Sequence, residues 1–282
     1  MPNPVISGQA NPSQIEGLNN LRTQVGQSNG APTYNTSSNS KTYFMAFDGT
    51  NNNRDKPSFG PETNVSLLDK QAQKSLLSDG SGDRNYYPGV GTTGPLQLLD
   101  AGSGASMKFT AREATADFQE WARQQYEANP NVEINLAGVS ASRGTITHTL
   151  TLNNIYNEGV GKRGSEIWSS DENGKPIVTG YSEHWQQPKS DNLGTHLMLD
   201  RVAGPMNAAG AEGVLLPPAA GLRVVNIRAL DEHRAEFASE SLRNPDGTID
   251  SSFTEIGVVG AHSNILGCYE NNGIADHVLD AG

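Results

Sequence analysis

The segment that decides the fold is Val132-Glu-Ile-Asn-Leu-Ala-Gly-Val139, which continues directly into Ser140-Ala-Ser-Arg-Gly144. Its first residues alternate between apolar and polar, and the later ones are apolar or small, which is typical of a strand near the middle of a sheet. Residues 145–156 then have the spacing of a helix. The segment therefore predicts a buried strand, a sharp turn that holds two serines, and a helix.

The same alternation of elements extends along the chain in both directions. Upstream, the patterns predict strands at 43–47 and 85–90 and helices at 64–79 and 110–129; downstream, they predict strands at 195–199, 222–230 and 255–259. Strands that alternate with helices favour an α/β fold with a mainly parallel sheet and helices on both faces. Functional sites in such folds lie at the carboxyl ends of the strands.

The composition of the chain divides it into a leader and one α/β domain. Residues 1–40 are rich in Asn, Ser, Gln, Gly and Pro, which predicts a flexible leader. Residues 41–282 carry the strand and helix patterns and are expected to form the functional domain. Within it, residues 159–193 are polar and turn-rich, which predicts an insertion over the sheet edge or a lid.

Charge and hydropathy narrow the classes of partner. The chain has 20 basic and 31 acidic residues, a net charge of -11, which disfavours nucleic acid as a ligand. No apolar stretch reaches the roughly 20 residues that a transmembrane helix needs. The first residues lack the basic and apolar regions of a classical signal peptide. The single Cys268 cannot form an intramolecular disulfide.

The turn at Ser140-Ala-Ser-Arg-Gly144 has the spacing of a nucleophile elbow. A serine on such a turn needs small residues two positions before and after it, and Ser142 has Ser140 and Gly144 there. The backbone N–H of Arg143 would then face the oxyanion position. Ser140 as the nucleophile is the competing register, and an ordinary turn that caps a helix is the simpler interpretation.

A serine nucleophile also needs a base and an orienting acid. His262 follows the predicted strand at 255–259 and is the candidate base. Asp200 ends an earlier strand, which gives the chain order Ser, Asp, His of one hydrolase class, and Asp231 at the end of the next strand is the rival acid. Either aspartate could instead be a helix cap.

Four segments together resemble the Tle1-type (type VI lipase effector-like) bacterial phospholipase family of α/β hydrolases. They are Phe47-Asp-Gly-Thr-Asn-Asn52, Tyr86-Tyr-Pro-Gly-Val-Gly-Thr92, Ser142-Arg-Gly144 and Gly260-Ala-His-Ser-Asn-Ile265. The resemblance implies an α/β-hydrolase-like fold and a Ser-Asp-His triad at Ser142, Asp200 and His262. It also implies that Gly49 or Thr50 supplies the second oxyanion donor beside Arg143. The sequence departs from the family where Ser140 replaces the usual glycine before the nucleophile.

The resemblance further implies what the protein acts on and where. The expected activity is serine-dependent hydrolysis of carboxylic esters in membrane phospholipids, with no cofactor. The expected setting is an antibacterial effector that a specialised system secretes into target cells. A secretion apparatus and a cognate immunity protein are the implied partners. Family members usually carry more sequence after the histidine, so a longer native protein is also expected.

Two other interpretations of the same residues stay open. In the first, Asp48 at a strand end is the nucleophile or metal ligand of a metal-dependent phosphoester hydrolase; its neighbours Asn51, Asn52, Asn53 and Asp55 could also hold an accessory Ca²⁺. In the second, the chain is a non-enzymatic or inactive α/β-hydrolase-fold scaffold that binds a partner through residues 159–193. Loss of turnover on substitution of His262 would separate an enzyme from such a scaffold.

Overall fold

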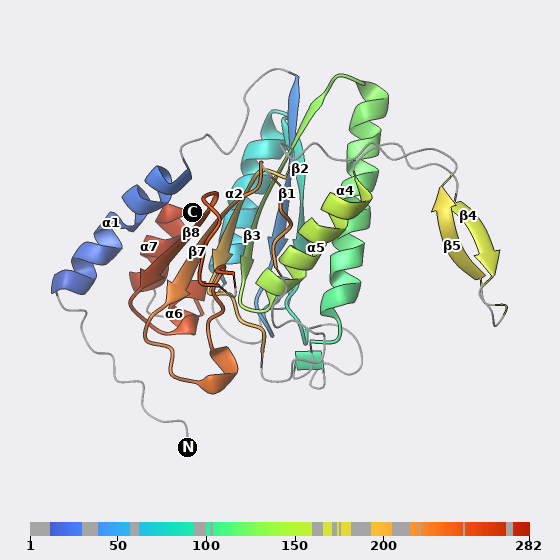
Figure 1. Cartoon of the computed structure of the whole chain (residues 1–282). Coiled ribbons are helices and arrows are strands. Elements are labelled where there is room, and N and C mark those ends of the chain that lie inside the picture. The colour runs from blue at the N-terminus through green and yellow to red at the C-terminus, as the bar shows by residue number, and fades with distance from the viewer. Residues whose placement is uncertain are drawn as a thin grey trace.

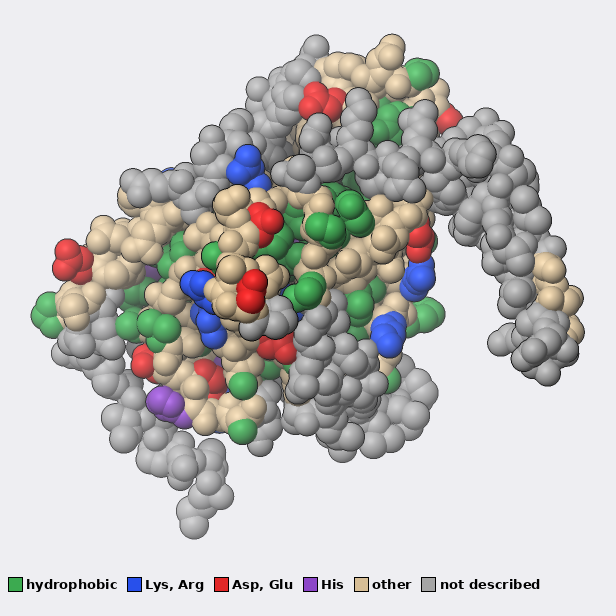
Figure 2. All heavy atoms as spheres, viewed as in Figure 1, with side chains coloured by type: hydrophobic (Ala, Val, Ile, Leu, Met, Phe, Trp, Pro, Cys, Tyr) green, Lys and Arg blue, Asp and Glu red, His purple; other side chains and the backbone are tan. Residues whose placement is uncertain are grey.

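The computed structural model describes most of the chain. The described residues are 12–29, 39–56, 62–92, 100–101, 104–159, 166–170, 174, 176–181, 193–204, 215–219, 221–244, 246–268 and 273–282. Within these ranges no helix combines the length and the hydrophobicity that a membrane span requires. On the face shown in Figure 2, acidic and basic side chains are interspersed among the coloured residues.

A six-stranded parallel sheet forms the centre of the molecule, in the order β2-β1-β3-β6-β7-β8. Its strands are β1 (Ser40–Phe47), β2 (Gly82–Tyr87), β3 (Glu133–Ala141), β6 (Thr195–Leu199), β7 (Arg223–Ala229) and β8 (Phe253–Val258). Because every pairing is parallel, the carboxyl ends of all six strands meet at one edge of the sheet. The predicted class, a mainly parallel α/β sheet, is confirmed.

Helices cover both faces of this sheet (Figure 1). They are α1 (Pro12–Asn29), α2 (Asn64–Ser78), α4 (Met107–Ala128), α5 (Gly144–Glu158), α6 (His262–Leu266) and α7 (Gly273–Ala281), with a 3₁₀ turn at Ala235–Phe237. One hydrophobic cluster joins α4 and α5 to the sheet, and a separate cluster joins α1, α2, α6 and α7 to it. The sheet is thus the middle layer of three.

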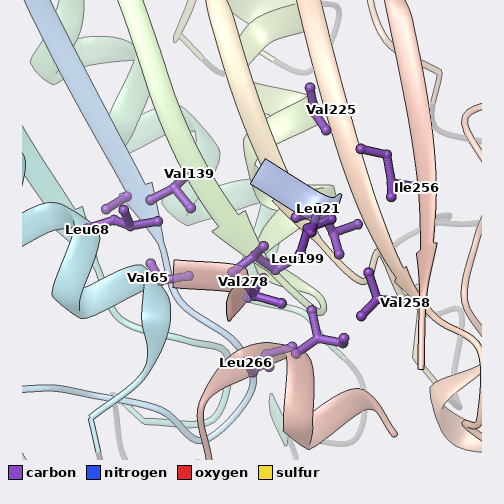
Figure 3. Close-up of a cluster of buried hydrophobic side chains, with 14 of the residues drawn as sticks. Leu21, Val65, Leu68, Val139, Leu199, Val225, Ile256, Val258, Leu266 and Val278 are labelled. Carbon is purple, nitrogen blue, oxygen red and sulfur yellow. The ribbon is translucent and has the colours of Figure 1, made fainter. Parts of the chain in front are cut away.

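The second cluster anchors the short helix α6. Figure 3 shows Leu266 of α6 among buried side chains that include Leu21 of α1, Val278 of α7 and Leu199 of β6. Burying a leucine side chain of this kind contributes roughly 1.5–3 kcal/mol. Helix α6 begins at His262, so this packing fixes the backbone that carries the histidine.

The expectation of a flexible leader over residues 1–40 is wrong for Pro12–Asn29. This segment is helix α1, which packs against α7, and its Leu18 and Leu21 are 6% and 0% exposed. Leu18 and Leu21 are buried in the core and Val25 packs half-buried against the same cluster, so the segment carries too weak a hydrophobic pattern to stand out in the sequence. Residues 1–11 and 30–38 of the predicted leader lie outside the described residues.

Several element boundaries differ from the predicted ranges by one to three residues, and the starts of α2 and β2 have specific contacts. The N-cap of α2 is Thr63, whose side chain accepts the N–H of Ser66, while Asn64 is buried and donates to the carbonyls of Ile265 and Ala275. Asn64 therefore ties α2 to the C-terminal helices. Strand β2 covers Gly82–Tyr87 and not 85–90, because the chain turns toward the loop after β1, where the Gly89 N–H donates to the Asn52 carbonyl.

The predicted insertion contains an antiparallel pair of strands, β4 (Glu166–Ser170) and β5 (Pro176–Tyr181). In Figure 1 this hairpin stands apart from the six-stranded sheet. In the chain it follows α5 and precedes β6. The role of residues 159–193 as an insertion or a lid stays a prediction, because residues 160–165, 171–173, 175 and 182–192 lie outside the described residues.

Candidate active site

Ser142 occupies a strained turn between β3 and α5. Its φ of 52° lies in the left-handed region, which a non-glycine residue adopts only where the surroundings enforce it. The Ser142 N–H donates to the Leu199 carbonyl at 3.0 Å, and the Ser142 carbonyl accepts the N–H of Thr145 at 3.1 Å and its hydroxyl at 2.6 Å. The turn thus has the backbone geometry expected of a nucleophile elbow.

Gly144 allows α5 to start against the end of β1. A Cβ at this position would lie 2.5 Å from the carbonyl oxygens of both Phe47 and Asp48. These oxygens belong to the backbone and cannot swing away, so any larger residue would force the helix off the sheet. The small residue two positions after Ser142 is therefore a steric requirement of the turn, as the sequence predicts.

Asp200 and His262 lie in direct contact, although 62 residues separate them in the chain. The Asp200 Oδ2 atom is 2.6 Å from His262 Nδ1, and its Oδ1 atom accepts the Ala229 N–H at 2.9 Å. The two residues are 0% and 3% exposed. Asp200 also has a positive φ, 49°, so the ends of the neighbouring strands β3 and β6 carry two strained residues side by side.

Asp231, the rival acid, has other partners. Its carboxylate accepts the Gly260 N–H at 2.8 Å, and its own N–H donates to the Gly260 carbonyl at 3.1 Å. These bonds join the loop after β7 to the loop after β8. The geometry therefore pairs His262 with Asp200 and gives Asp231 a role in holding the histidine loop.

The elbow and helix α6 border the same glycine. A Cβ on Gly49 would lie 3.4 Å from Ser142 Cβ and 3.1 Å from the Leu266 side chain, four residues after His262. Among the described residues no hydrogen bond joins the Ser142 hydroxyl to His262. Enzymes without substrate often hold a nucleophile and its base further apart than the reacting complex does.

Gly49 and Thr50, the two candidates for the second oxyanion donor, differ in whether their backbone N–H is free. The Gly49 N–H donates to the side chain of Asp48 at 2.7 Å, so it is not free to bind an oxyanion. The N–H groups of Thr50 and Arg143 have no acceptor in the part of the chain that the structure describes. Thr50 and Arg143, and not Gly49, are therefore the available pair of donors.

Asp48 itself is a structural carboxylate. It is 1% exposed, and it accepts the hydroxyl of Tyr86 at 2.7 Å, the hydroxyl of Thr63 at 2.8 Å and the N–H of Gly49. Burial raises the pKa of Asp48 to about 6. Its oxygens face hydrogen-bond donors, which favours a role in fixing the loop after β1 over that of a nucleophile.

The described residues contain no cluster of three His, Cys, Asp or Glu side chains suited to a metal ion. In the segment proposed for Ca²⁺, the Asn53 side chain accepts the Asp55 N–H and the Asn51 N–H donates to the Val90 carbonyl. These bonds shape the loop. An accessory Ca²⁺ there stays a prediction.

Ser140, the competing nucleophile, belongs to a sealed polar cluster. Its hydroxyl lies 3.0 Å from His148 Nδ1, and both residues are 0% exposed. The His148 ring stacks on Phe47 and meets the edge of His196. Burial lowers the pKa of His148 well below its usual value and that of His196 to about 4, so both rings are neutral. A substrate has no access to this serine.

The sequence pattern did not identify Glu232, which contacts the histidine loop. The Glu232 side chain accepts the His262 N–H at 3.1 Å and pairs with Arg234 at 2.6 Å; the hydrogen bond from Arg234 lowers the pKa of Glu232 to about 2. Arg234 lies over the Phe237 ring, whose centroid is 5.1 Å from that of His262. The only signal in the sequence was their position directly after a strand.

The comparisons with known proteins support the fold. No protein-family model and no curated protein sequence matches the chain. A crystal structure of an uncharacterized protein from Pseudomonas aeruginosa aligns with a TM-score of 0.53 and 16% identity, over 96% of this chain and 48% of that one. The chain thus spans about half the length of that protein.

Two further solved structures align less closely. A dienelactone hydrolase-like promiscuous phosphotriesterase from metagenomic libraries aligns with a TM-score of 0.38 and 12% identity, over 86% of this chain and 84% of that one. An acetyl xylan esterase aligns with a TM-score of 0.31 and 12% identity, over 85% of this chain and 90% of that one. The structure itself shows an α/β fold in which a strained serine turn lies at the carboxyl edge of a parallel sheet, between a strand and a helix, as in a nucleophile elbow.

Proposed function

We propose that this chain is a serine-dependent carboxylic ester hydrolase, with Ser142 as nucleophile, His262 as base and Asp200 as orienting acid. The observation that carries the proposal is the buried 2.6 Å contact between Asp200 and His262, at the sheet edge where Ser142 has a positive φ. Three elements far apart in the chain supply these groups in the order found in α/β hydrolases. Nothing in core packing requires two strained residues at adjacent strand ends.

The reaction follows from the chemistry of the three groups. Asp200 accepts a hydrogen bond from the Nδ1–H group of His262. This bond holds the proton on Nδ1, so Nε2 is unprotonated and can take the proton of the Ser142 hydroxyl. The serine oxygen attacks the ester carbonyl, and the N–H groups of Arg143 and Thr50 stabilise the oxyanion. His262 then gives its proton to the leaving alcohol, and water hydrolyses the acyl-enzyme by the same steps.

A membrane phospholipid is the substrate class that we propose within this chemistry. The support is the resemblance of four sequence segments to the Tle1-type phospholipases, together with the way those segments surround the serine. The loop after β1 bonds to the loop after β2 through Gly89 and Asn52, and Gly49 borders Ser142. Secretion as an antibacterial effector, with a cognate immunity protein, belongs to the same proposal.

A panel of short-chain phospholipids and aryl esters tests the proposed function. The wild type is expected to release fatty acid from at least one phospholipid, equally well with and without EDTA, while Ser142→Ala releases none. Absence of turnover on every ester would overturn the proposal and favour a binding scaffold. Release of the phosphate-bearing headgroup without fatty acid, abolished by EDTA, would favour the metal-dependent phosphoester interpretation of Asp48.

Glu232 is expected to act as a positioning residue for His262. Glu232→Ala removes the acceptor for the His262 N–H, and a base displaced by a fraction of an ångström should lower kcat about tenfold with KM little changed. Glu232→Gln keeps an acceptor oxygen and should restore most of kcat, although it loses the charge facing Arg234. Steady-state kinetics with Tm values check this. A Gln variant as slow as the Ala variant would contradict the positioning role.

A further inference from the structure

The side chain of Arg143 is a buried cation directly beside the proposed nucleophile. Arg143 is 7% exposed. Its Nε atom donates to the Thr50 hydroxyl at 2.7 Å, but its Nη1 atom is buried and has no hydrogen-bond partner among the described residues. Burial lowers the pKa of the guanidinium, which still carries its charge. A buried donor of this kind destabilises the fold unless something binds it.

The surroundings hold the guanidinium in place without neutralising it. Gly204 has a φ of 94°, and a Cβ there would lie 2.7 Å from Arg143 Cδ, so the backbone after β6 presses on the side chain. Asp100 is the carboxylate whose charge acts on Arg143. Its oxygens already accept the Gly91 N–H and both the N–H and the hydroxyl of Ser106. Asp100 therefore attracts the cation from a distance.

A second buried arginine in the same fold shows the contrast. Arg201, at the start of the loop after β6, is 3% exposed and pairs with Glu240 at 3.2 Å and with the Thr149 hydroxyl at 2.8 Å. Buried arginines usually need such a carboxylate to offset their desolvation. Arg143 has no carboxylate paired with it among the described residues, although it is next to Ser142 in the chain.

We propose that the guanidinium of Arg143 binds an anionic oxygen of the substrate, in a phosphodiester or carboxylate group next to the ester that Ser142 attacks. This proposal rests on the ester hydrolysis proposed above. A guanidinium presents parallel N–H donors that match such oxygens, and its Nη1 donor is the unpaired one. The N-terminus of α5, where Arg143 is the N-cap, adds positive potential at the same place. The preferred substrates are then anionic esters.

Matched pairs of esters with and without the anion test this specificity. One pair is dihexanoyl phosphatidylglycerol, which carries a phosphodiester, and dihexanoylglycerol; the other is an aryl hemiglutarate and the corresponding aryl pentanoate. Arg143→Gln is expected to lose at least about tenfold more kcat/KM on the anionic member than on the neutral one, mainly through KM. The pair with the larger difference identifies phosphate or carboxylate as the preferred anion.

Thr50→Val is the matched control, because it removes the acceptor of Arg143 Nε and keeps the charge. If the arginine only positions the Thr50 backbone, both substitutions lower turnover of anionic and neutral esters equally, which would overturn the proposal. Arg143→Lys keeps a charge without the planar fork and is expected to retain part of the preference for anions. If Arg143→Gln fails to fold, as its Tm would show, the comparison of anionic and neutral esters is made with Arg143→Lys instead.

Inorganic phosphate supplies a readout that needs no turnover. Phosphate is expected to raise the Tm of the wild type and to leave that of Arg143→Gln unchanged. If the wild type hydrolyses none of the four esters, the proposed function fails, and the Tm response alone decides about the anion site. A phosphate response that persists in Arg143→Gln would contradict the Arg143 site even where ester hydrolysis stands.

Discussion

Ser142→Ala is expected to reduce ester turnover by a factor on the order of 10⁶, to the limit of detection. The substitution removes the oxygen that attacks the ester carbonyl, so no acyl-enzyme forms that water and His262 could hydrolyse. Alanine fits the space of the serine, and the bonds that hold the turn run through the backbone of Ser142. The Tm should therefore change little. Initial rates on a soluble ester, with circular dichroism of both proteins, provide the measurement.

Ser140→Ala is the matched control for this prediction. Ser140 lies two residues away and is bonded to the buried ring of His148. Its loss should lower the free energy of unfolding by roughly 1–3 kcal/mol, because a buried nitrogen loses its partner, and should leave kcat within a few-fold of the wild type. Turnover that disappears with Ser140→Ala and survives in Ser142→Ala would mean that the other register is the functional one.

Asp200→Asn is expected to lower kcat by about 10⁴-fold while the protein stays folded. The carboxylate accepts both the Ala229 N–H and His262 Nδ1. If the oxygen of the introduced amide keeps the bond to Ala229, its NH₂ group must donate to Nδ1. The imidazole proton then moves to Nε2, and the ring can no longer take the proton of Ser142. Steady-state kinetics on the ester used for Ser142→Ala checks the result.

Asp231→Asn provides the comparison for the acid. Asp231 contacts Gly260 in the histidine loop but does not touch the imidazole. An amide oxygen can still accept the Gly260 N–H, so kcat should fall by less than about tenfold. If instead Asp231→Asn is the inactive variant and Asp200→Asn is nearly normal, the pairing of Asp200 with His262 does not operate in the reaction.

The sequence predicted the parts of the fold that local patterns encode. Strand β3, the turn at Ser142 and helix α5 appear as a change from alternating to helical spacing within one continuous segment, and they form as predicted. The order of strands and helices was sufficient to predict a parallel sheet. The need for a small residue at position 144 could be predicted because a tight strand-to-helix turn leaves no room for a side chain there.

Contacts between distant segments could not be predicted from such patterns. The choice of Asp200 over Asp231 depends on which strand end faces α6, and helix α1 enters the core through a few apolar residues, chiefly Leu18 and Leu21. The hydrogen bond from the Gly49 N–H to the Asp48 carboxylate depends on the rotamer of the Asp48 side chain, which a sequence pattern does not encode. The charge of Arg143 was visible in the sequence, but the lack of a partner for its Nη1 atom among the described residues emerges only from the packing of the loops around it.

Labelling with a fluorophosphonate tests the central claim most directly, because the probe forms a covalent adduct only with a serine that a neighbouring base activates. Intact-mass and peptide analysis of the wild type should show one adduct, on Ser142. Ser140→Ala should label at the same rate, and Ser142→Ala and Asp200→Asn should label little or not at all. Equal labelling of the wild type and Ser142→Ala, or an adduct on any other serine, would contradict the account.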